Sequence, residues 1–424
     1  MKIENKDLVP VIDFWHKSLT KKDLFSREAL GEINFSNKEI IDVMGPRRSG
    51  KSSLFKLIKD RLGLNDDFLY VNFEDPFFIE NNGVEILEKL IETYKAYFNP
   101  ELKYLFFDEI QEIKNWEKGI RKLRDGTDYK IFITGSSSKL LSKELSSSIT
   151  GRHTTVKMMP LNFREFLFFK KVEIDSPKDV ILKENIIKKK FQEYMNQGGF
   201  PEVTKTDNKE LLKNYFYDFL QKDVIIRNQI RDKSSLEKMA VFLMTNSGKT
   251  VSIASLKKAF NLSYETANNY LEYLKEAFLV FELKKFSFSL KKQSQAVPKI
   301  YSVDTGLARE VSFSFSQDSG RILENVIFLN LIMKFEDIFY YTTSNDFEVD
   351  FLVREKNKNQ FLIQVCLNLE EEKTREREIR ALDEAMKELK MKKSFIITNN
   401  QEEKIKTENG IINVLPAWKW LLEK

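Results

Sequence analysis

The sequence predicts an α/β protein whose first part is a parallel sheet with helices on both faces. Three features support this fold class: a glycine-rich phosphate-binding motif, short apolar runs that end in polar residues, and amphipathic helical segments between those runs. Strands that alternate with helices are typical of a parallel sheet covered on both sides. After this part we expect a helical region, a helix–turn–helix–strand region and a second α/β region.

The glycine-rich motif matches the P-loop pattern G-x-x-x-x-G-K-[ST] and reads Gly45-Pro46-Arg47-Arg48-Ser49-Gly50-Lys51-Ser52. Residues 39–44 before it predict a strand, and residues 53–62 after it have helical periodicity. Such a loop points backbone N–H groups at phosphate oxygens, and the helix N-terminus adds positive charge. We therefore expect residues 45–53, Ser53 included, to bind ATP, with Lys51 on the β- and γ-phosphates and Ser52 on Mg²⁺. The alternative is a chance Gly/Ser-rich turn.

Length and composition limit the other possibilities. A chain of 424 residues suggests two or three domains, and a net charge of +5 permits a nucleic-acid partner without requiring one. Cys366 is the only cysteine, which excludes an internal disulfide, and the two histidines lie far apart in sequence. Without an apolar leader or a run long enough to span a bilayer, we expect a cytoplasmic protein with no membrane partner.

A second chemical signal is the acid pair Asp108-Glu109, which ends the apolar run 104–107. Residues 68–73 predict another strand, residues 83–98 a helix, and residues 130–135 a further strand with a polar end. We expect the strand that carries the acids to lie beside the P-loop strand. Asp108 would then meet Mg²⁺ through water, and Glu109 would polarise the attacking water as general base. The alternative is an acidic turn after a core strand.

Two further positions are candidates for sensing or completing the site. Thr134, or alternatively Ser136, follows a strand where a γ-phosphate sensor would lie. Arg152 follows the Ser-rich segment 140–150 and is positioned to reach the γ-phosphate of a neighbouring subunit. The alternatives are a polar loop start and an ordinary surface arginine.

Several of these motifs together resemble the archaeal-type AAA+ ATPases, and the resemblance covers nearly the whole chain. They are the P-loop, Phe73-Glu74-Asp75-Pro76, Phe107-Asp108-Glu109-Ile110-Gln111 with Trp116, Thr134-Gly135-Ser136-Ser137, Thr150-Gly151-Arg152, Pro160-Leu161-Asn162-Phe163-Arg164-Glu165-Phe166 and Gly198-Gly199-Phe200-Pro201-Glu202. The resemblance implies an AAA+ module, with Arg152 as the arginine finger. It also implies assembly into rings or other oligomers, such as a hexamer, with ATP between subunits.

Residues 171–235 are charged and rich in helical pattern, with a break at Gly198-Gly199-Phe200-Pro201. Helices on both sides of that break are consistent with the helical lid that follows an AAA+ core, since Pro201 ends one helix and the glycines allow a bend. A plain linker between domains is the alternative.

Residues 236–310 predict a winged helix. An amphipathic helix over 251–260, a turn at 261–263, a helix over 264–278 and an alternating strand over 281–288 follow one another in the required order. Tyr264, Thr266, Asn268 and Asn269 are candidates to face DNA, with Lys284, Lys285, Lys291 and Lys292 on phosphates. Glu265 and Glu272 would repel DNA, and such modules also bind proteins.

Residues 311–424 resemble the restriction-endonuclease-like fold. Glu324 lies in an expected helix over 321–333, Asp350 in a strand over 347–353, and Gln364 and Cys366 in a strand over 361–366; a helix over 374–389 and a strand over 394–398 follow. The family's motif has a metal-binding Glu where Gln364 stands and a Lys where Cys366 stands. Because a neutral amide is a poor Mg²⁺ ligand and a thiol carries no fixed positive charge, we expect a degenerate nuclease fold.

The sequence therefore predicts four domains: residues 1–170 as an AAA+ core, 171–235 as a lid, 236–310 as a winged helix and 311–424 as a degenerate nuclease-like domain. The predicted reaction is Mg²⁺-dependent ATP hydrolysis coupled to DNA binding or remodelling, in a branch-migration, mobile-element or defence context. The alternatives are a nucleotide-controlled scaffold or signalling switch that binds proteins, and an active ATP-dependent nuclease.

Overall fold

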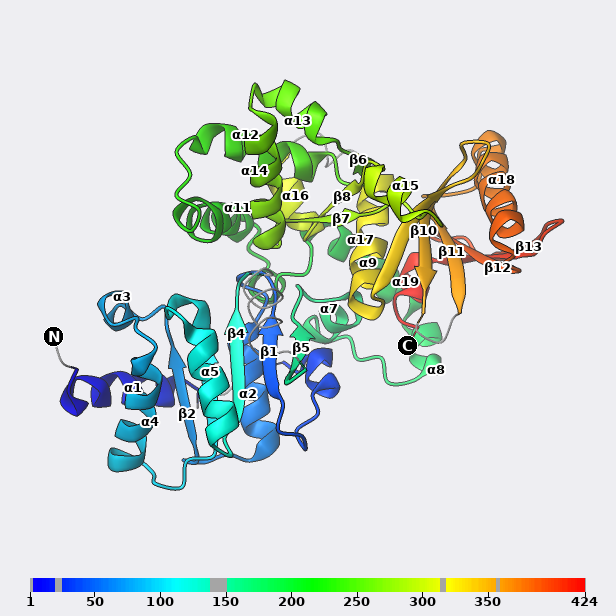
Figure 1. The fold of residues 1–424 in the computed structure, drawn as a ribbon. Coiled ribbons are helices and arrows are strands. Elements are labelled where there is room, and N and C mark those ends of the chain that lie inside the picture. Colours follow the sequence, from blue (N-terminus) through cyan, green and yellow to red (C-terminus); the bar gives the residue numbers. More distant parts are fainter. Residues whose placement is uncertain (1–2, 20–24, 138–150, 313–317, 356–358, 424) are drawn as a thin grey trace. The chain divides into compact units, whose positions relative to one another are not determined.

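The computed structural model describes residues 3–19, 25–137, 151–312, 318–355 and 359–423 (Figure 1). The expected segment 140–150, which includes Thr150, lies outside these residues. The chain divides into two compact units, Met1–Met159 and Pro160–Lys424. The fold class is confirmed: a parallel five-stranded sheet lies in the first unit and a separate mixed sheet in the second.

The first unit is a five-stranded parallel sheet with the order β2-β3-β4-β1-β5. Its strands are β1 (Ile40–Met44), β2 (Phe68–Asn72), β3 (Tyr104–Asp108), β4 (Lys130–Gly135) and β5 (His153–Lys157). The expectation that the acid-bearing strand lies beside the P-loop strand is wrong, because β4 is inserted between β3 and β1. The carboxyl ends of all three strands still share one edge of the sheet, since the strands are parallel.

Two hydrophobic cores, one on each face of this sheet, explain why its strands are almost continuously apolar. On one face, Leu105, Phe107 and Ile133 pack with helices α1 (Asn5–Leu19), α4 (Glu85–Tyr97) and α5 (Trp116–Gly126). On the other face, Phe106 and Phe132 stack with ring centroids 4.7 Å apart and pack with α2 (Lys51–Leu62). The alternation of strand residues between two cores fixes the register that brings the polar strand ends together.

The second unit begins with helices: α7 (Phe163–Phe169), α8 (Pro177–Leu182), α9 (Glu184–Gln197), α10 (Pro201–Thr206), α11 (Glu210–Asp218) and a π-helical segment, η4 (Phe219–Ile226). The expected break at 198–201 separates α9 from α10. A buried carboxylate holds it, because the Gly199 N–H donates to Asp304 Oδ2 over 2.7 Å. Asp304 also caps α16 (Thr305–Val311) by accepting from the Leu307 N–H.

A helical and antiparallel region follows, made of α12 (Lys233–Thr245), α13 (Ile253–Phe260) and α14 (Tyr264–Glu276), with a small sheet of order β6-β8-β7. Its strands are β6 (Lys249–Thr250), β7 (Val280–Leu283) and β8 (Lys299–Ser302), and α15 (Leu290–Gln295) precedes β8. Ser263 begins α14 by accepting from the Thr266 N–H.

The strand expected over 281–288 is wrong in its second half, because β7 ends at Leu283. From Lys284 onward the backbone bonds instead to the next sheet, where the Phe286 N–H donates to the Tyr340 carbonyl over 2.8 Å. The Phe286 side chain is buried there against Phe339 and Tyr341. Tertiary packing therefore overrides the alternating pattern of this segment.

The last region is a six-stranded mixed sheet of order β13-β14-β12-β11-β10-β9, drawn in yellow to red in Figure 1. Its strands are β9 (Asp337–Thr342), β10 (Glu348–Arg354), β11 (Gln360–Val365), β12 (Lys393–Thr398), β13 (Glu403–Lys406) and β14 (Ile411–Pro416). Its helices are α17 (Ser319–Lys334), α18 (Glu372–Leu389) and α19 (Ala417–Trp420). Across the residues that the structure describes, no helix combines the length and apolar character needed to cross a membrane.

Candidate functional site

The candidate site lies at the carboxyl edge of the parallel sheet, where loop 45–50 connects β1 to α2. Gly45 is required by close packing, because a Cβ there would lie 2.0 Å from the carbonyl oxygen of Met158. Gly50 has a φ of 100°, a left-handed value that favours glycine, and it directly precedes the first helical residue, Lys51. These constraints bend the backbone around the start of α2, where free helix N–H groups attract anions.

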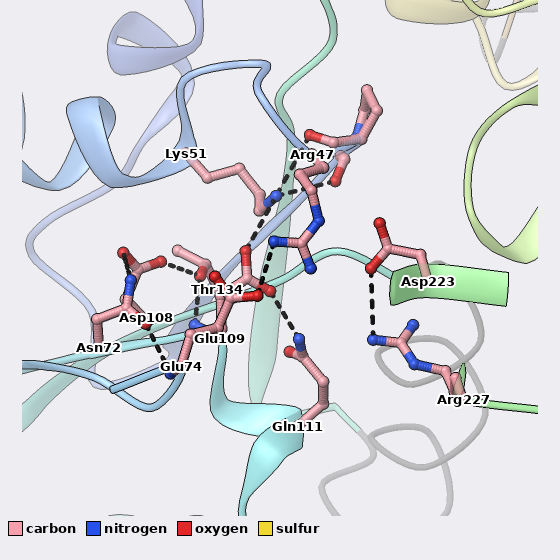
Figure 2. A network of polar contacts seen from close by, with 12 residues as sticks. Arg47, Lys51, Asn72, Glu74, Asp108, Glu109, Gln111, Thr134, Asp223 and Arg227 are labelled. Atoms are coloured by element: carbon pink, nitrogen blue, oxygen red, sulfur yellow. Dashed lines mark hydrogen bonds and ion pairs between the residues drawn. The ribbon is translucent and has the colours of Figure 1, made fainter. Parts of the chain in front are cut away.

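Lys51 is buried in this loop, with its ammonium held by three weak contacts. Its Nζ donates to the carbonyl oxygens of Gly45 and Pro46 over 3.2 and 3.3 Å. It also lies 3.4 Å from Glu109 Oε1, and Figure 2 shows the side chain directed at that carboxylate. The amino group is therefore buried, and its contacts in the described part of the chain are all longer than 3 Å.

Asp108 ends β3 in full burial and is surrounded by hydrogen-bond donors. It accepts hydrogen bonds from Tyr70 Oη (3.0 Å), from Asn72 Nδ2 (3.3 Å) and from the Thr134 hydroxyl. Its side chain also hydrogen-bonds to Ser52, so the structure brings the two expected metal-holding residues together. Burial, followed by the charge of Glu109, raises the pKa of Asp108, while these hydrogen bonds oppose the rise.

Glu109 occupies an unusual backbone conformation, with a φ of 52° for a non-glycine residue. Its N–H donates to Thr134 Oγ1 over 2.9 Å, and its Oε2 accepts from Gln111 Nε2 over 2.6 Å. Burial raises the pKa of this carboxyl, but the positive charges of Lys51 and Arg47 outweigh burial and lower it to about 2. Glu109 is therefore ionised at neutral pH and is able to accept a proton.

The remaining loop residues line the rim of the site. Arg47 Nη1 lies 2.6 Å from Glu74 Oε1, and the exposed Arg48 has a φ of 64°. Among the described residues, the hydroxyl of Ser49 is buried without a hydrogen-bond partner. Ser53 follows Ser52 in the first turn of α2. A buried, unpaired hydroxyl inside a P-loop is consistent with a loop shaped for an anionic ligand.

Arg152 is not brought to this edge. Its carbonyl oxygen accepts from the Ile40 N–H, which places it at the start of β1 rather than at the P-loop end. A single guanidinium nitrogen, Nη1, donates to both carboxylate oxygens of Asp125, over 2.7 and 2.6 Å. Within one chain Arg152 therefore lies at the opposite end of the sheet from Lys51.

Sequence reasoning missed four residues that shape the site. Tyr70 and Asn72 hold Asp108, and Gln111 holds Glu109. Arg27 is 5% exposed, and its guanidinium donates to the carbonyl oxygens of Ser49 (2.7 Å) and Met159 (2.8 Å). Asn72 was detectable as a polar strand end next to β3, whereas no local pattern marks Arg27.

A second polar cluster lies in the C-terminal region and contains the expected nuclease-like positions. Glu324 (α17) and Asp350 (β10) converge on the ammonium of Lys299, the first residue of β8. Gln364 Oε1 accepts from the backbone N–H of Asp350, and burial raises the pKa of the Cys366 thiol to about 12. Among the residues that the structure describes, no group of three or more His, Cys, Asp or Glu side chains has the arrangement of a metal site.

The chain was compared with protein families and with individual proteins, and the matches divide it into an N-terminal AAA domain and two further domains. Residues 37–167 match the family model described as AAA domain, and residues 188–318 and 319–420 match two domains of unknown function (DUF8612 and DUF4143). An uncharacterized protein of Methanocaldococcus jannaschii is 41% identical over 411 residues, covering 92% of this chain and 90% of that protein. An uncharacterized protein of Haemophilus influenzae is 29% identical over 417 residues, covering 95% of this chain and 100% of that protein.

Solved structures with partial likeness include the Aeropyrum pernix Orc1 protein in complex with DNA and AMPPCP-bound DnaA from Aquifex aeolicus. The first aligns with a TM-score of 0.31 at 10% identity, over 66% of this chain and 87% of that one. The second has a TM-score of 0.25 at 16% identity, over 64% of this chain and 91% of that one. Scores this low support no conclusion about activity or partners.

The AAA-domain match covers the loop, the acid pair and Thr134, and the archaeal relative is matched along nearly its whole length. Both agree with the motif set found in the sequence. The chain belongs to the archaeal-type AAA+ ATPase family, and its first unit is a P-loop ATPase domain.

Proposed function

We propose that this protein binds ATP and Mg²⁺ and hydrolyses ATP at the edge of the first unit's sheet. The observation that carries the proposal is the contact between the two acids and the two P-loop residues: Asp108 with Ser52, and Glu109 with Lys51. A chance Gly/Ser-rich turn would have no reason to meet a buried acid pair from another strand. The Ser49 hydroxyl, which has no partner in the described part of the chain, and the helix start at Lys51 fit a bound triphosphate.

The residues have distinct roles in this proposal. Mg²⁺, when bound, would neutralise charge on the phosphate oxygens, and the hydroxyl of Ser52 with the carboxylate of Asp108 would hold it. Lys51 would exchange its three weak contacts for phosphate oxygens, which are stronger partners of an ammonium than backbone carbonyls. Glu109 would accept the proton of the attacking water, and Thr134, already bonded to both acids, would orient them.

The direct test compares Lys51→Ala with Glu109→Gln in nucleotide binding and ATP hydrolysis. Lys51→Ala should lose binding, whereas Glu109→Gln should still bind ATP and hydrolyse it about 10²- to 10⁴-fold more slowly. Glu112→Gln is the matched control, because Glu112 is an exposed acid three residues further along the chain. Equal hydrolysis by Lys51→Ala, Glu109→Gln and the parent protein contradicts the assignment.

We further propose that hydrolysis is coupled to DNA through residues 236–310 acting as a winged helix. The order α12, β6, α13, α14, β7, β8 supports this, as does a basic segment around α15. The expected phosphate-binding lysines are accessible: Lys284, Lys291 and Lys292 are exposed, and Lys285 is partly exposed. Of the residues expected to face DNA, Tyr264 on α14 is 60% exposed, and the other three, Thr266, Asn268 and Asn269, are partly buried.

One observation favours the alternative, a nucleotide-controlled scaffold or signalling switch that binds proteins. Phe288 and Leu290, next to the basic residues, are 84% and 81% exposed, and large exposed apolar side chains often mark protein contacts. ATPase rates measured with single-stranded, duplex and branched DNA distinguish the two. Stimulation that weakens as salt rises supports DNA coupling, whereas indifference to every nucleic acid supports the scaffold.

We also propose that chains assemble, with a hexameric ring as the first arrangement to test, and that Arg152 completes the site of a neighbour. Arg152 supports this because it lies away from its own P-loop and its side chain is 39% exposed beside Asp125.

The proposal also includes the division into core (1–170), lid (171–235), winged helix (236–310) and nuclease-like domain (311–424), and a cytoplasmic location. Mass measurement with an ATP analogue and branched DNA would report subunit number and ligand together.

Nuclease activity is not part of the proposed function. The neutral Gln364 and the protonated Cys366 replace the carboxylate and the cation that a metal nuclease needs. Incubation of plasmid or oligonucleotide DNA with Mg²⁺ or Mn²⁺ tests this directly. DNA cutting that disappears in Asp350→Ala would show that the domain is an active nuclease.

A further inference from the structure

The cluster around Lys299 has the composition of a cation site whose cation is part of the chain. Lys299 Nζ lies 2.8 Å from Glu348 Oε1, 3.1 Å from Glu324 Oε1 and 3.1 Å from Asp350 Oδ1. Its Nζ donates hydrogen bonds to Glu324 and Asp350 and forms an ion pair with Glu348. The charged partners that the structure shows for Lys299 are therefore all acidic groups.

The lysine and two of its acids are withdrawn from solvent. The side chain of Lys299 is 3% exposed, and those of Glu324 and Asp350 are 13% and 9% exposed; only Glu348 is near half-exposed. Burial lowers the pKa of Lys299, but the surrounding carboxylates, Asp350 first, raise it well above its ordinary value. The group thus stays an ammonium throughout the physiological pH range.

Neighbouring polar groups fix the acids around this ammonium. Tyr301 Oη donates to the same Glu324 oxygen over 2.6 Å, and the Val365 N–H donates to Asp350 Oδ2 over 2.9 Å. The Tyr340 ring lies 5.9 Å from Lys299 Nζ, and Gln364 bonds to the Asp350 backbone. Carboxylates held in this way are preorganised for one positive charge at their centre.

We propose that the Lys299 ammonium occupies the cation position of this cluster, so that the cluster is closed to divalent metals and becomes a metal site when Lys299 is removed. A metal ion needs the carboxylate oxygens at about 2.0–2.6 Å from a common centre, and Nζ already fills that centre. Expelling a buried lysine would leave its own charge unpaired, which is strongly unfavourable. The inference goes beyond the proposed ATPase function and does not depend on it.

The experiment uses the full chain without nucleotide and measures Mn²⁺ binding by electron paramagnetic resonance, together with thermal unfolding. Lys299→Met should unfold at a lower temperature than the parent, and millimolar Mn²⁺ should recover much of that loss. Its Mn²⁺ affinity should be at least about tenfold tighter than that of the parent, with one additional ion per chain. The double variant Lys299→Met, Asp350→Asn should lose the additional ion, which excludes a contribution from Asp108 and Glu109.

Lys275→Met is the matched control. Lys275 Nζ lies 2.7 Å from Glu272 and 2.6 Å from Glu282, so its replacement also removes one positive charge from an acidic neighbourhood. This variant should gain no Mn²⁺ ion, because two partly exposed acids do not form a closed shell. A Lys299→Met protein that binds no more Mn²⁺ than Lys275→Met overturns the proposal.

The parent protein gives an independent decision if Lys299→Met does not fold. Mn²⁺ binding should then be compared between the parent and Asp350→Asn alone. The proposal expects identical Mn²⁺ binding by the two proteins, since the parent cluster admits no metal. A bound ion in the parent that Asp350→Asn removes would show that the cluster is an open metal site.

Discussion

Two buried lysines, each facing carboxylates, have opposite characters in this molecule. Lys51 has contacts of 3.2 to 3.4 Å, two of them to backbone carbonyls. The Ser49 hydroxyl of the same loop is buried and has no hydrogen-bond partner among the residues that the structure describes. Lys299 has contacts of 2.8 to 3.1 Å to three different acids. A buried lysine beside carboxylates is therefore not enough to define a binding site. The ammonium is free to bind a ligand only where its present partners hold it weakly.

The largest expected difference is in stability. Lys299→Met should lower the free energy of unfolding of the second unit by about 3–5 kcal/mol, because three acids lose their shared cation. Lys51→Met should change the stability of the first unit much less, since one carboxylate and two carbonyls lose weak contacts. Chemical denaturation of both variants checks this, with fluorescence and circular dichroism followed separately because the two units need not unfold together. Equal losses of stability in the two variants would show that Lys299 is held no more firmly than Lys51.

The two clusters should also respond to pH with opposite sign. Burial and then the charge of Asp350 raise the pKa of Glu324 to about 7, so its stabilising contribution is complete below pH about 4.5 and is lost as pH rises through about 7. The pKa of Glu109 is lowered to about 2, so its contribution is present above pH about 4.5 and is lost as pH falls toward 2. Each effect is at most about 3 kcal/mol.

Calorimetry between pH 3 and pH 8 separates these two effects when the single variants are compared with the parent. Glu324→Gln should flatten the decline toward pH 7, and Glu109→Gln should flatten the loss in acid. If Glu324→Gln changes the stability loss in acid, or Glu109→Gln changes the decline toward pH 7, the assigned directions of the pKa shifts are wrong.

Arg27 lies outside the P-loop motif and supports the loop that holds Lys51. Arg27→Ala should weaken ATP binding by about 2 kcal/mol, since two carbonyl oxygens lose a charged hydrogen-bond donor. Arg27→Lys should recover part of this binding, as a lysine retains the charge but cannot donate from two separate nitrogens in a fixed fork. Nucleotide titration with a fluorescent ATP analogue measures both.

Arg121→Ala is the control for Arg27, because Arg121 is an exposed arginine of the same unit that pairs with Asp125 at 3.8 Å. It should leave ATP binding unchanged. Loss of binding in Arg121→Ala equal to that in Arg27→Ala would mean that a general charge effect, not support of the loop, explains the result.

The smallest stability effect is expected at Arg152. Its pair with Asp125 is exposed to solvent, so Arg152→Ala should change the free energy of unfolding very little. If Arg152 completes a neighbour's site, the variant should nevertheless lose ATPase activity at protein concentrations where chains associate. ATPase rate as a function of protein concentration tests this, and an unchanged profile argues against the role in trans.

The P-loop domain was predictable because its signals are local. The loop, the acid pair and the strand ends are each contained within a few residues, and the parallel sheet follows from alternating strands and helices. The order of the strands was not local information, which is why the insertion of β4 between β3 and β1 was missed. Thr134 bonds to both acids, a contact that no local pattern in the sequence could establish.

Lys299 could not have been found from the sequence. It lies at the start of a short strand, 25 residues before Glu324 and 51 residues before Asp350, with no motif to connect them. Only the meeting of β8, α17 and β10 defines the cluster. The same applies to Arg27, whose partners are backbone carbonyls and therefore leave no trace in residue type.

The packing of Gly45 against Met158 has a mechanical consequence. The segment that carries the chain out of the first unit passes so close to the phosphate loop that no methyl group fits between them. Arg27 then ties the carbonyl of Met159, the last residue of that unit, to the carbonyl of Ser49 through one guanidinium. These contacts join the loop to the segment by which the chain leaves the first unit, so a displacement of one also moves the other.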